Sequence, residues 1–186
     1  NIDPDKIEEK ITEKTKAIIP VHIFGQSADM DKINVIAKKH NLKVIEDACQ
    51  AVGAKYKGKM IGTLSDVACF SFFPTKNLSC AGDGGMIVTS DDSIATIATA
   101  LRTHGSGETG QKAYNLLNNI TEEVATSKSG DDTVYNPQKY YNYLIGFNTR
   151  LDAIQAGILS VKLPYLDKWI EKRNLNAKVY YKNLKH

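Results

Sequence analysis

Hydrophobic and polar positions near the start of the chain follow the order of a strand, a helix and a strand. The apolar runs Ala17–Phe24 and Leu42–Ala48 each predict a buried strand. Between them, apolar residues recur at helical spacing, and either Asp29 or Asp31 could begin that helix. This order predicts two parallel neighbouring strands that are joined by a right-handed crossover.

The same patterns predict further elements along the rest of the chain. They indicate strands over about Asp66–Phe72 and Met86–Ser90, and helices from Asp3-Pro4, from Asp91 to about Arg102, over Leu151–Leu163 and from Pro164 onward. The helix over Leu151–Leu163 is expected to turn four residues toward the core, namely Leu151, Ile154, Ile158 and Val161. Strands and helices in this arrangement indicate an α/β fold.

A polar segment interrupts these patterns from about residue 106 to residue 143. Few apolar positions recur there, so we expect a long loop with at most short elements. Loops of this kind are often functional or mobile.

Composition and charge exclude several classes of protein. A net charge of +3 is too small to argue for a nucleic-acid-binding protein. The three cysteines, Cys49, Cys69 and Cys80, are odd in number and include no CxxC pair. They therefore indicate neither a disulfide framework nor a zinc site, and we expect no bound metal. A reducing compartment fits this cysteine usage best.

The sequence shows no targeting or membrane segment. No signal peptide precedes the first predicted helix, and no apolar stretch approaches the roughly 20 residues of a membrane span. We therefore expect a cytoplasmic protein that does not enter a membrane. The chain begins at Asn1 without an initiator methionine, which suggests a piece of a longer protein.

Three polar residues near predicted strand ends give the strongest functional signal. Asp47 lies at the carboxyl end of a predicted parallel strand, where open α/β sheets bind ligands. Ser71 lies in the next strand, and Lys76 follows between the apolar FSFFP segment and a glycine-rich turn. Pyridoxal phosphate (PLP) chemistry requires a carboxylate that keeps the pyridine nitrogen protonated, a hydroxyl for the phosphate and a lysine for a Schiff base.

Each candidate also has a purely structural interpretation. Taken alone, Asp47 is more often a helix or turn cap, and Ser71 is an ordinary strand serine. A lone lysine such as Lys76 is usually solvated, but its apolar flanks favour the functional interpretation. For His22 and His104, structural packing or loop hydrogen bonding is the favoured interpretation.

Five stretches make the chain resemble the sugar aminotransferases of the DegT/DnrJ/EryC1/StrS family. They are PVHIFGQSADMD (20–31), VIEDACQAVGA (44–54), SFFPTKNLSCAGDGGMIVT (71–89), RTHG (102–105) and GFNTRLDAIQAGIL (146–159). They occur in the family's order and cover nearly the whole chain apart from the polar segment. The resemblance implies the aspartate aminotransferase fold (fold type I), whose PLP-binding large domain has three α/β/α layers around a mainly parallel sheet.

The resemblance assigns roles to four residues around the cofactor ring and phosphate. Lys76 would form the Schiff base with PLP and would move the proton between the substrate Cα and the cofactor C4′. Asp47 would pair with the pyridine nitrogen, and Gln50 would hydrogen-bond the ring hydroxyl. Ser71 would bind the phosphate.

The resemblance also implies a homodimer with shared active sites. Asn148, with Arg150 close behind it, would reach the cofactor phosphate in the partner subunit, although the GFN sequence also suits a simple turn. Cys49 would lie against one face of the ring, where the family usually has a small apolar residue. Cysteine is only slightly larger, so we expect no loss of chemistry.

The matching stretches correspond to the central part of the family's chain. Residues 1–163 would form part of the PLP-binding large domain, and residues 164–186 would form a helix that leads toward a missing small domain. The large domain would therefore be incomplete, and the piece could be inactive by itself.

Together these expectations favour a PLP-dependent aminotransferase that moves an amino group from glutamate to a keto group on a nucleotide-linked sugar. Two alternatives stay open. One is a PLP-dependent sugar dehydratase on the same fold, in which histidine replaces the key lysine, so Lys76 argues against it. The other is a truncated or regulatory relative without turnover. The expected partners are the keto sugar, glutamate and a second subunit, with no nucleic acid and no membrane.

Overall fold

The computed structural model describes residues 1–122, 124 and 137–184, so part of the predicted polar loop lies outside the described residues. Two compact units make up the chain. Unit 1 comprises residues 1–88 and 151–186, and unit 2 comprises residues 89–150. The proposed limit between a large domain and a following helix at residue 164 stays a prediction.

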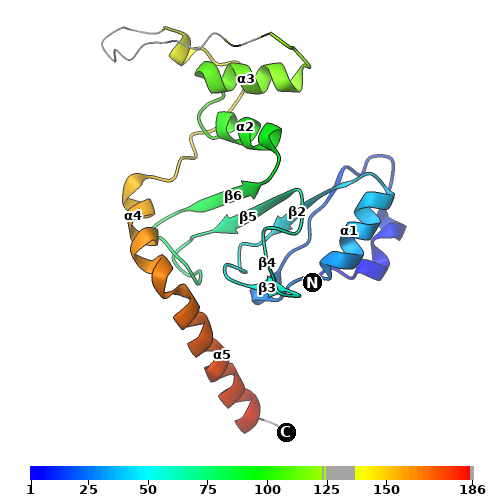
Figure 1. Ribbon diagram of the computed structural model, residues 1–186, viewed down its shortest axis with the longest axis vertical. Coiled ribbons are helices and arrows are strands. Elements are labelled where there is room, and N and C mark those ends of the chain that lie inside the picture. Colours follow the sequence, from blue (N-terminus) through cyan, green and yellow to red (C-terminus); the bar gives the residue numbers. More distant parts are fainter. Residues whose placement is uncertain (123, 125–136, 185–186) are drawn as a thin grey trace. The chain divides into compact units, whose positions relative to one another are not determined.

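A four-stranded sheet with the order β1-β2-β5-β6 forms the centre of unit 1. Its strands are β1 (Ala17–Ile18), β2 (Lys43–Asp47), β5 (Val67–Ser71) and β6 (Gly85–Thr89). Strand β2 pairs in parallel with both β1 and β5, and the arrows of β5 and β6 point in opposite directions (Figure 1). The predicted α/β class with a mainly parallel sheet is therefore confirmed.

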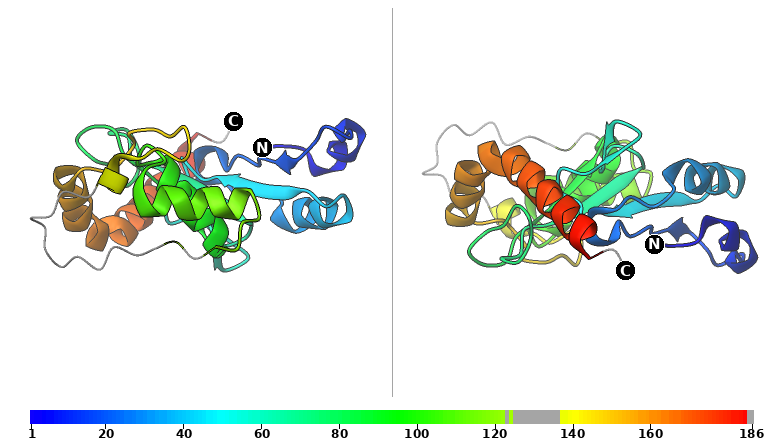
Figure 2. Two further views of the ribbon diagram at one scale, coloured as in Figure 1. Left: turned by 90° about the horizontal axis from the view of Figure 1, so that it is seen from above. Right: turned by 90° about the horizontal axis from the view of Figure 1, so that it is seen from below.

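The helix between β1 and β2 forms as the apolar spacing predicts. Helix α1 (Met30–Lys39) begins after Asp29, whose carboxylate accepts the Lys32 N–H. Its buried side chains pack with those of β1 and β2 in one hydrophobic core. Helix α1 and the N-terminal segment lie side by side at the end of unit 1 away from α4 (Figures 1 and 2).

The N-terminal helix is more tightly wound than the sequence predicts, and the first strand is shorter. The segment after Asp3 forms two 3₁₀ turns, Pro4–Lys6 and Glu8–Lys10, instead of an α-helix. The apolar run Ala17–Phe24 is a strand only over β1, with one further bridge from Val21 to Asp47. Its end turns into the 3₁₀ segment Ile23–Gly25, because Phe24 has a left-handed backbone conformation that cannot continue a strand.

A hairpin of β3 (Lys55–Tyr56) and β4 (Lys59–Met60) occupies the predicted polar turn. Its two central residues, Lys57 and Gly58, both have positive φ values, as a type I′ turn requires.

Two consecutive helices close unit 1. Helix α4 (Ala153–Lys162) leads through the 3₁₀ turn Leu163–Tyr165 into α5 (Leu166–Asn183). The predicted inner face of α4 is wrong in part, because Ile154 and Val161 are 75% and 71% exposed. Leu159 is the buried residue of α4, since the helix contacts the core containing Phe72 with its other side.

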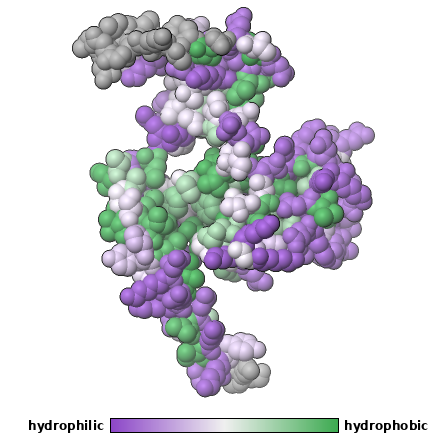
Figure 3. All heavy atoms as spheres, viewed as in Figure 1, coloured by the Kyte–Doolittle hydropathy of each residue, from purple (hydrophilic) through white to green (hydrophobic). Residues whose placement is uncertain are grey.

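Hydrophobic residues gather on the visible face around α4, whereas the face around α1 is hydrophilic (Figure 3). In the part of the chain that the structure describes, no helix combines the length and the apolar character needed to cross a bilayer.

Unit 2 contains more helix than the polar pattern predicts. Helix α2 (Asp92–Leu101) begins at the predicted Asp91 cap. The segment predicted as a loop starts with an 11-residue helix, α3 (Gly107–Leu117), and includes the 3₁₀ turn Pro137–Tyr140. The prediction of at most short elements is therefore wrong at α3, which forms because it packs against α2 and buries Ala113.

A buried carboxylate ties two segments of unit 1, the one at His22 and residues 62–65, to the end of β2. Glu46 and His22 are both 0% exposed. Glu46 accepts hydrogen bonds from His22 Nε2 (3.0 Å), the Gly62 N–H (2.9 Å), the Leu64 N–H (3.1 Å) and Ser65 Oγ (2.8 Å). Burial raises the pKa of the Glu46 carboxyl, but these four bonds outweigh burial and leave the pKa below its ordinary value of 4.5.

We expect Glu46→Gln to destabilise the protein by about 3 kcal/mol. In either orientation the new amide NH₂ replaces an oxygen that accepts a backbone N–H, from Gly62 or from Leu64. Thermal unfolding of the full-length protein measures the effect, with the exposed Glu13→Gln as the matched control. An unfolding midpoint equal to that of Glu13→Gln would contradict the prediction.

The pH dependence of stability has a defined sign at this group. Because folding lowers the pKa of Glu46, its contribution is complete above about pH 4.5. The contribution then declines as the pH falls through the folded-state pKa. Glu46→Gln should therefore lose its difference from the wild type progressively in acid.

Candidate active site

The candidate residues of the sequence lie at the carboxyl ends of β2 and β5. Asp47 is the last residue of β2 and pairs in register with Cys69 of β5. Ser71 is the last residue of β5, and Lys76 follows in a turn in which its N–H donates to the Phe73 carbonyl (2.8 Å). Parallel pairing of the two strands places both ends at the same edge of the sheet.

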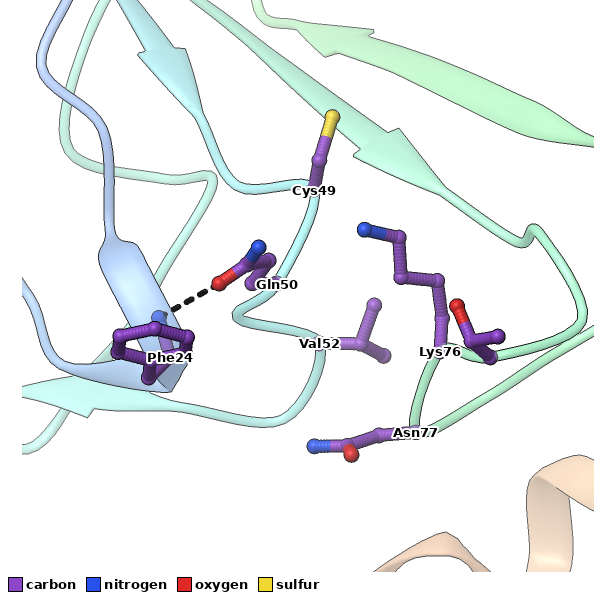
Figure 4. A pocket seen from close by; sticks show the side chains of 7 residues that line it. Phe24, Cys49, Gln50, Val52, Lys76 and Asn77 are labelled. Atoms are coloured by element: carbon purple, nitrogen blue, oxygen red, sulfur yellow. Dashed lines mark hydrogen bonds between the residues drawn. The ribbon is translucent and has the colours of Figure 1, made fainter.

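A pocket of about 300 Å³ opens beside this edge (Figure 4). Three of the predicted residues, Lys76, Cys49 and Gln50, line it together. The Lys76 amine points toward Cys49 across the pocket (Figure 4). The volume of the pocket lies at the lower end of the range for small-molecule binding sites.

The charges of Asp47 and Lys76 both act on the Cys49 thiol. Burial raises the pKa of this thiol to about 11, and the neighbouring Asp47 carboxylate acts in the same direction. The positive charge of Lys76 acts in the opposite direction. A carboxylate and an ammonium group therefore both lie near Cys49, whose thiol stays protonated at neutral pH.

Asp47 adjoins the pocket but does not line it. It is half-buried, and its Oδ1 accepts the Cys49 N–H (3.1 Å), which holds the carboxylate next to the pocket wall. The carboxylate also forms a hydrogen bond with the Cys49 side chain, and a carboxylate has further acceptor positions for a bound group.

Gln50 has one side of its amide already engaged. Its Oε1 accepts the Phe24 N–H at 2.8 Å, as the dashed line in Figure 4 marks. A backbone N–H can bond only to the amide oxygen, so the orientation of the amide is fixed. The Gln50 Nε2 group is left to donate hydrogen bonds.

Ser71 is not among the residues that line the pocket. Its hydroxyl accepts the Phe73 N–H (3.3 Å) in the turn that leads to Lys76. Its phosphate-binding role stays a prediction.

Four further residues that the sequence did not predict also line the pocket. Thr75 and Asn77 flank Lys76, so their proximity to it in the chain was an available signal. Val52 lies two residues after Gln50, so chain proximity was a signal there too, whereas Phe24 gave no such signal because its position depends on the fold of the loop at residues 22–28.

Asn148 and Arg150 lie in unit 2, and both are exposed. The segment is fixed to the end of α2, because the Phe147 N–H donates to the Leu101 carbonyl and the Thr149 N–H to the Arg102 carbonyl (3.1 Å). Arg150 Nη2 donates to Asn148 Oδ1 at 3.5 Å. Asn148 is therefore held in a defined loop, and its role toward a partner subunit stays a prediction.

A second pocket of about 520 Å³ shares the Thr75–Asn77 wall with the first. Besides Lys76, three further cations line it, Lys162, Lys172 and Arg173, and its lining residues include no carboxylate. Lys162 Nζ donates to the Ser79 carbonyl (2.7 Å), while Lys172 and Arg173 form no ion pair with a described residue. The pocket therefore suits an anionic group.

Comparison with known proteins decides the family of the chain. A sequence profile of the DegT/DnrJ/EryC1/StrS aminotransferase family matches residues 1–186. The chain belongs to this family. The predicted resemblance is thereby confirmed.

Two relatives are identical to this chain at nearly half of the aligned residues. The chain is 47% identical over 186 residues to a dTDP-3-amino-3,6-dideoxy-alpha-D-galactopyranose transaminase of Aneurinibacillus thermoaerophilus, covering 100% of the chain and 43% of that protein. It is 49% identical to a "pleiotropic regulatory protein" of Geobacillus stearothermophilus over 180 residues, covering 97% of the chain and 40% of that protein. The chain thus spans about two fifths of the length of these relatives.

A solved structure confirms the fold. The chain superposes on S. venezuelae DesV with a TM-score of 0.79 at 39% sequence identity, covering 98% of the chain and 41% of DesV. The described part of this chain is thus similar to the corresponding part of DesV.

The residues of the first pocket fit PLP. Lys76 supplies an amine for covalent attachment, and Gln50 Nε2 supplies a donor for a ring oxygen. The Asp47 carboxylate can accept a hydrogen bond from a pyridine N–H. Among the described residues, no cluster of three or more histidine, cysteine or acidic side chains could hold a metal ion.

We expect PLP to attach to Lys76 in the full-length protein. Borohydride reduction followed by peptide mapping should place the label on Lys76, because its amine is the one that enters the pocket. The nearby hairpin lysines Lys55, Lys57 and Lys59 are the internal controls. A label on any of them instead would contradict the assignment.

Proposed function

We propose that the full-length protein is a PLP-dependent aminotransferase that moves an amino group from glutamate to a keto group on a nucleotide-linked sugar. The observation that carries the proposal is the Lys76 amine, which enters a pocket beside the Asp47 carboxylate and the Gln50 amide. When bound, PLP supplies an electron sink for the bonds at the amino-bearing carbon.

The chain's own residues would each perform one part of this reaction. The Lys76 amine would attach the cofactor and, once released, would move a proton at the amino-bearing carbon. The Asp47 carboxylate would hold a proton on the pyridine nitrogen, and Gln50 Nε2 would orient the ring through its oxygen. The protonated Cys49 thiol would lie against the ring as a neutral group.

The substrate class has independent support in the charge around the pocket. The second pocket carries Lys162, Lys172 and Arg173 beside Lys76, and this positive charge suits the phosphates of a nucleotide-linked sugar. A sugar dehydratase is disfavoured, because lysine occupies the position where dehydratases of this fold are expected to have histidine. The three free cysteines support the cytoplasm as the compartment.

Asp47→Asn tests the chemistry of the proposal. Full-length protein is incubated with PLP and glutamate and then with a panel of nucleotide-linked keto sugars, while 2-oxoglutarate and the amino sugar are measured. We expect Asp47→Asn to slow both half-reactions by about 100-fold or more, since an amide cannot stabilise a protonated pyridine nitrogen in a partly dry site.

The cofactor content of the variant is the control, because a variant that loads PLP normally must lose rate through chemistry alone. Near-normal turnover in Asp47→Asn would show that Asp47 is only a turn cap. Dehydration of the sugars without amino transfer would contradict the proposed reaction.

We further propose a homodimer in which Asn148 reaches the cofactor phosphate bound by the partner subunit. Mixing a Lys76→Ala subunit with an Asn148→Ala subunit tests this arrangement. A shared site places both lesions in one pocket of the heterodimer and leaves the other pocket intact, so inactive parents should regain activity on mixing. No recovery, with subunit exchange verified, would place Asn148 outside the partner's site.

A further inference from the structure

The imidazole of His22 closes the loop that carries Phe24. The loop runs from residue 22 to residue 28, and the Ala28 N–H returns to donate to His22 Nδ1 at 3.1 Å. Ala28 is buried, so its N–H has no access to water as a substitute acceptor. Both ends of the loop therefore meet at one side chain.

This contact assigns different hydrogen-bonding roles to the two ring nitrogens of His22. Nδ1 accepts a hydrogen bond and so carries a lone pair, which leaves the ring proton on Nε2. Nε2 then donates to the Glu46 carboxylate at 3.0 Å. The two ring nitrogens thus perform different tasks, since Nδ1 closes the loop and Nε2 ties it to β2.

His22 is also fixed to the end of β2 through its backbone. Its N–H donates to the Asp47 carbonyl (3.0 Å), and the Asp47 N–H donates to the Pro20 carbonyl (2.9 Å). Side chain and backbone of His22 are therefore held by two consecutive residues, Glu46 and Asp47. The second of these lies beside the cofactor pocket.

The loop holds Phe24 in a conformation that it would not adopt freely. Phe24 has φ 55° and ψ 23°, the left-handed region, which is unusual for a bulky aromatic residue. Its side chain is 89% exposed, so burial of the ring does not hold it there. The surrounding hydrogen bonds must hold the backbone in place.

The Phe24 N–H in turn sets the direction of the Gln50 amide. It donates to Gln50 Oε1 at 2.8 Å, which leaves Gln50 Nε2 as the donor available to a ligand (Figure 4). If Phe24 relaxed, the amide could rotate and present its oxygen to the ligand instead. An oxygen would repel an anionic ring oxygen, whereas an N–H stabilises it.

We propose that His22 is a positioning residue of the cofactor site: its Nδ1 closes the loop, the loop holds the Phe24 N–H, and that N–H keeps Gln50 Nε2 directed at the bound cofactor. This inference rests on the proposed function of the pocket. It goes beyond packing, because it assigns different effects to the two nitrogens of one buried ring.

Two substitutions separate the nitrogens. His22→Asn keeps an amide oxygen near the position of Nδ1 and loses the reach to Glu46, whereas His22→Gln keeps a donor near Nε2 and loses the acceptor for Ala28. In the full-length protein, we expect His22→Gln to weaken PLP binding about tenfold. His22→Asn should lower the unfolding temperature but bind PLP within about twofold of the wild type.

The link to Gln50 is tested by a double-mutant cycle. Gln50→Ala should weaken PLP binding and shift the absorption band of the bound cofactor, and His22→Gln should shift the band in the same direction. Adding His22→Gln to Gln50→Ala should change neither quantity further, because the amide that His22 positions is already absent. Additive effects would overturn the proposal.

Ile33→Ala is the control for destabilisation alone, since Ile33 is buried on α1 and makes no hydrogen bond to the loop through its side chain. It should lower the unfolding temperature without changing PLP affinity. If PLP affinity falls with unfolding temperature across all variants, His22 is merely structural and the proposal is wrong.

The remaining outcomes are also decisive. If His22→Gln does not fold, the PLP affinity of His22→Asn decides. A wild-type affinity would support the proposal, and a tenfold loss of affinity would contradict it. A wild-type protein that fails to bind PLP would overturn the proposed function together with this inference. Normal wild-type binding with unaltered affinity and spectrum in His22→Gln would overturn this inference alone.

Discussion

The candidate site depends on one buried carboxylate at the end of β2. Glu46 has no contact with water, and its charge is stable only because four donors from two segments surround it. Since Glu46 directly precedes Asp47, the same residues that satisfy Glu46 also fix the strand end from which the cofactor-binding groups emerge. A structural requirement of the core and the geometry of the site are therefore linked through adjacent residues.

Parallel pairing of β2 and β5 explains why residues distant in the sequence meet. The pairing brings Asp47 and Cys69 into register, and the short turn after β5 returns Lys76 to the same edge. Burial keeps the Cys49 thiol protonated, with a pKa of about 11, so it does not compete with Lys76 as a nucleophile at neutral pH. The pocket thus contains one amine suited to covalent attachment and neutral or hydrogen-bonding groups around it.

Local patterns in the sequence were sufficient for the βαβ unit and for part of the candidate site. The Asp29 and Asp91 caps, the parallel strands and the pocket residues Lys76, Cys49 and Gln50 follow from short-range signals and from the family's motifs. Errors arose where tertiary contacts decide. Nothing in the run Ala17–Phe24 indicates that Phe24 leaves the strand, because that depends on the His22, Ala28 and Gln50 contacts.

Tertiary contacts also account for the incorrect predictions at α4 and α3. Helical spacing predicted an inner face of α4 that includes Ile154, but Leu159 is buried instead because that side of the helix contacts the core containing Phe72. The polar composition of α3 concealed a helix that is stabilised by packing against α2. Sequence patterns therefore predicted elements better than the partners of those elements.

A crystal structure of the full-length protein with PLP would test the central claim most directly. The account predicts continuous density from Lys76 Nζ to the cofactor, an Asp47 oxygen within hydrogen-bonding distance of the pyridine nitrogen, and Gln50 Nε2 facing the ring oxygen. A cofactor bound away from Lys76, or an Asp47 carboxylate turned away from the ring, would contradict it.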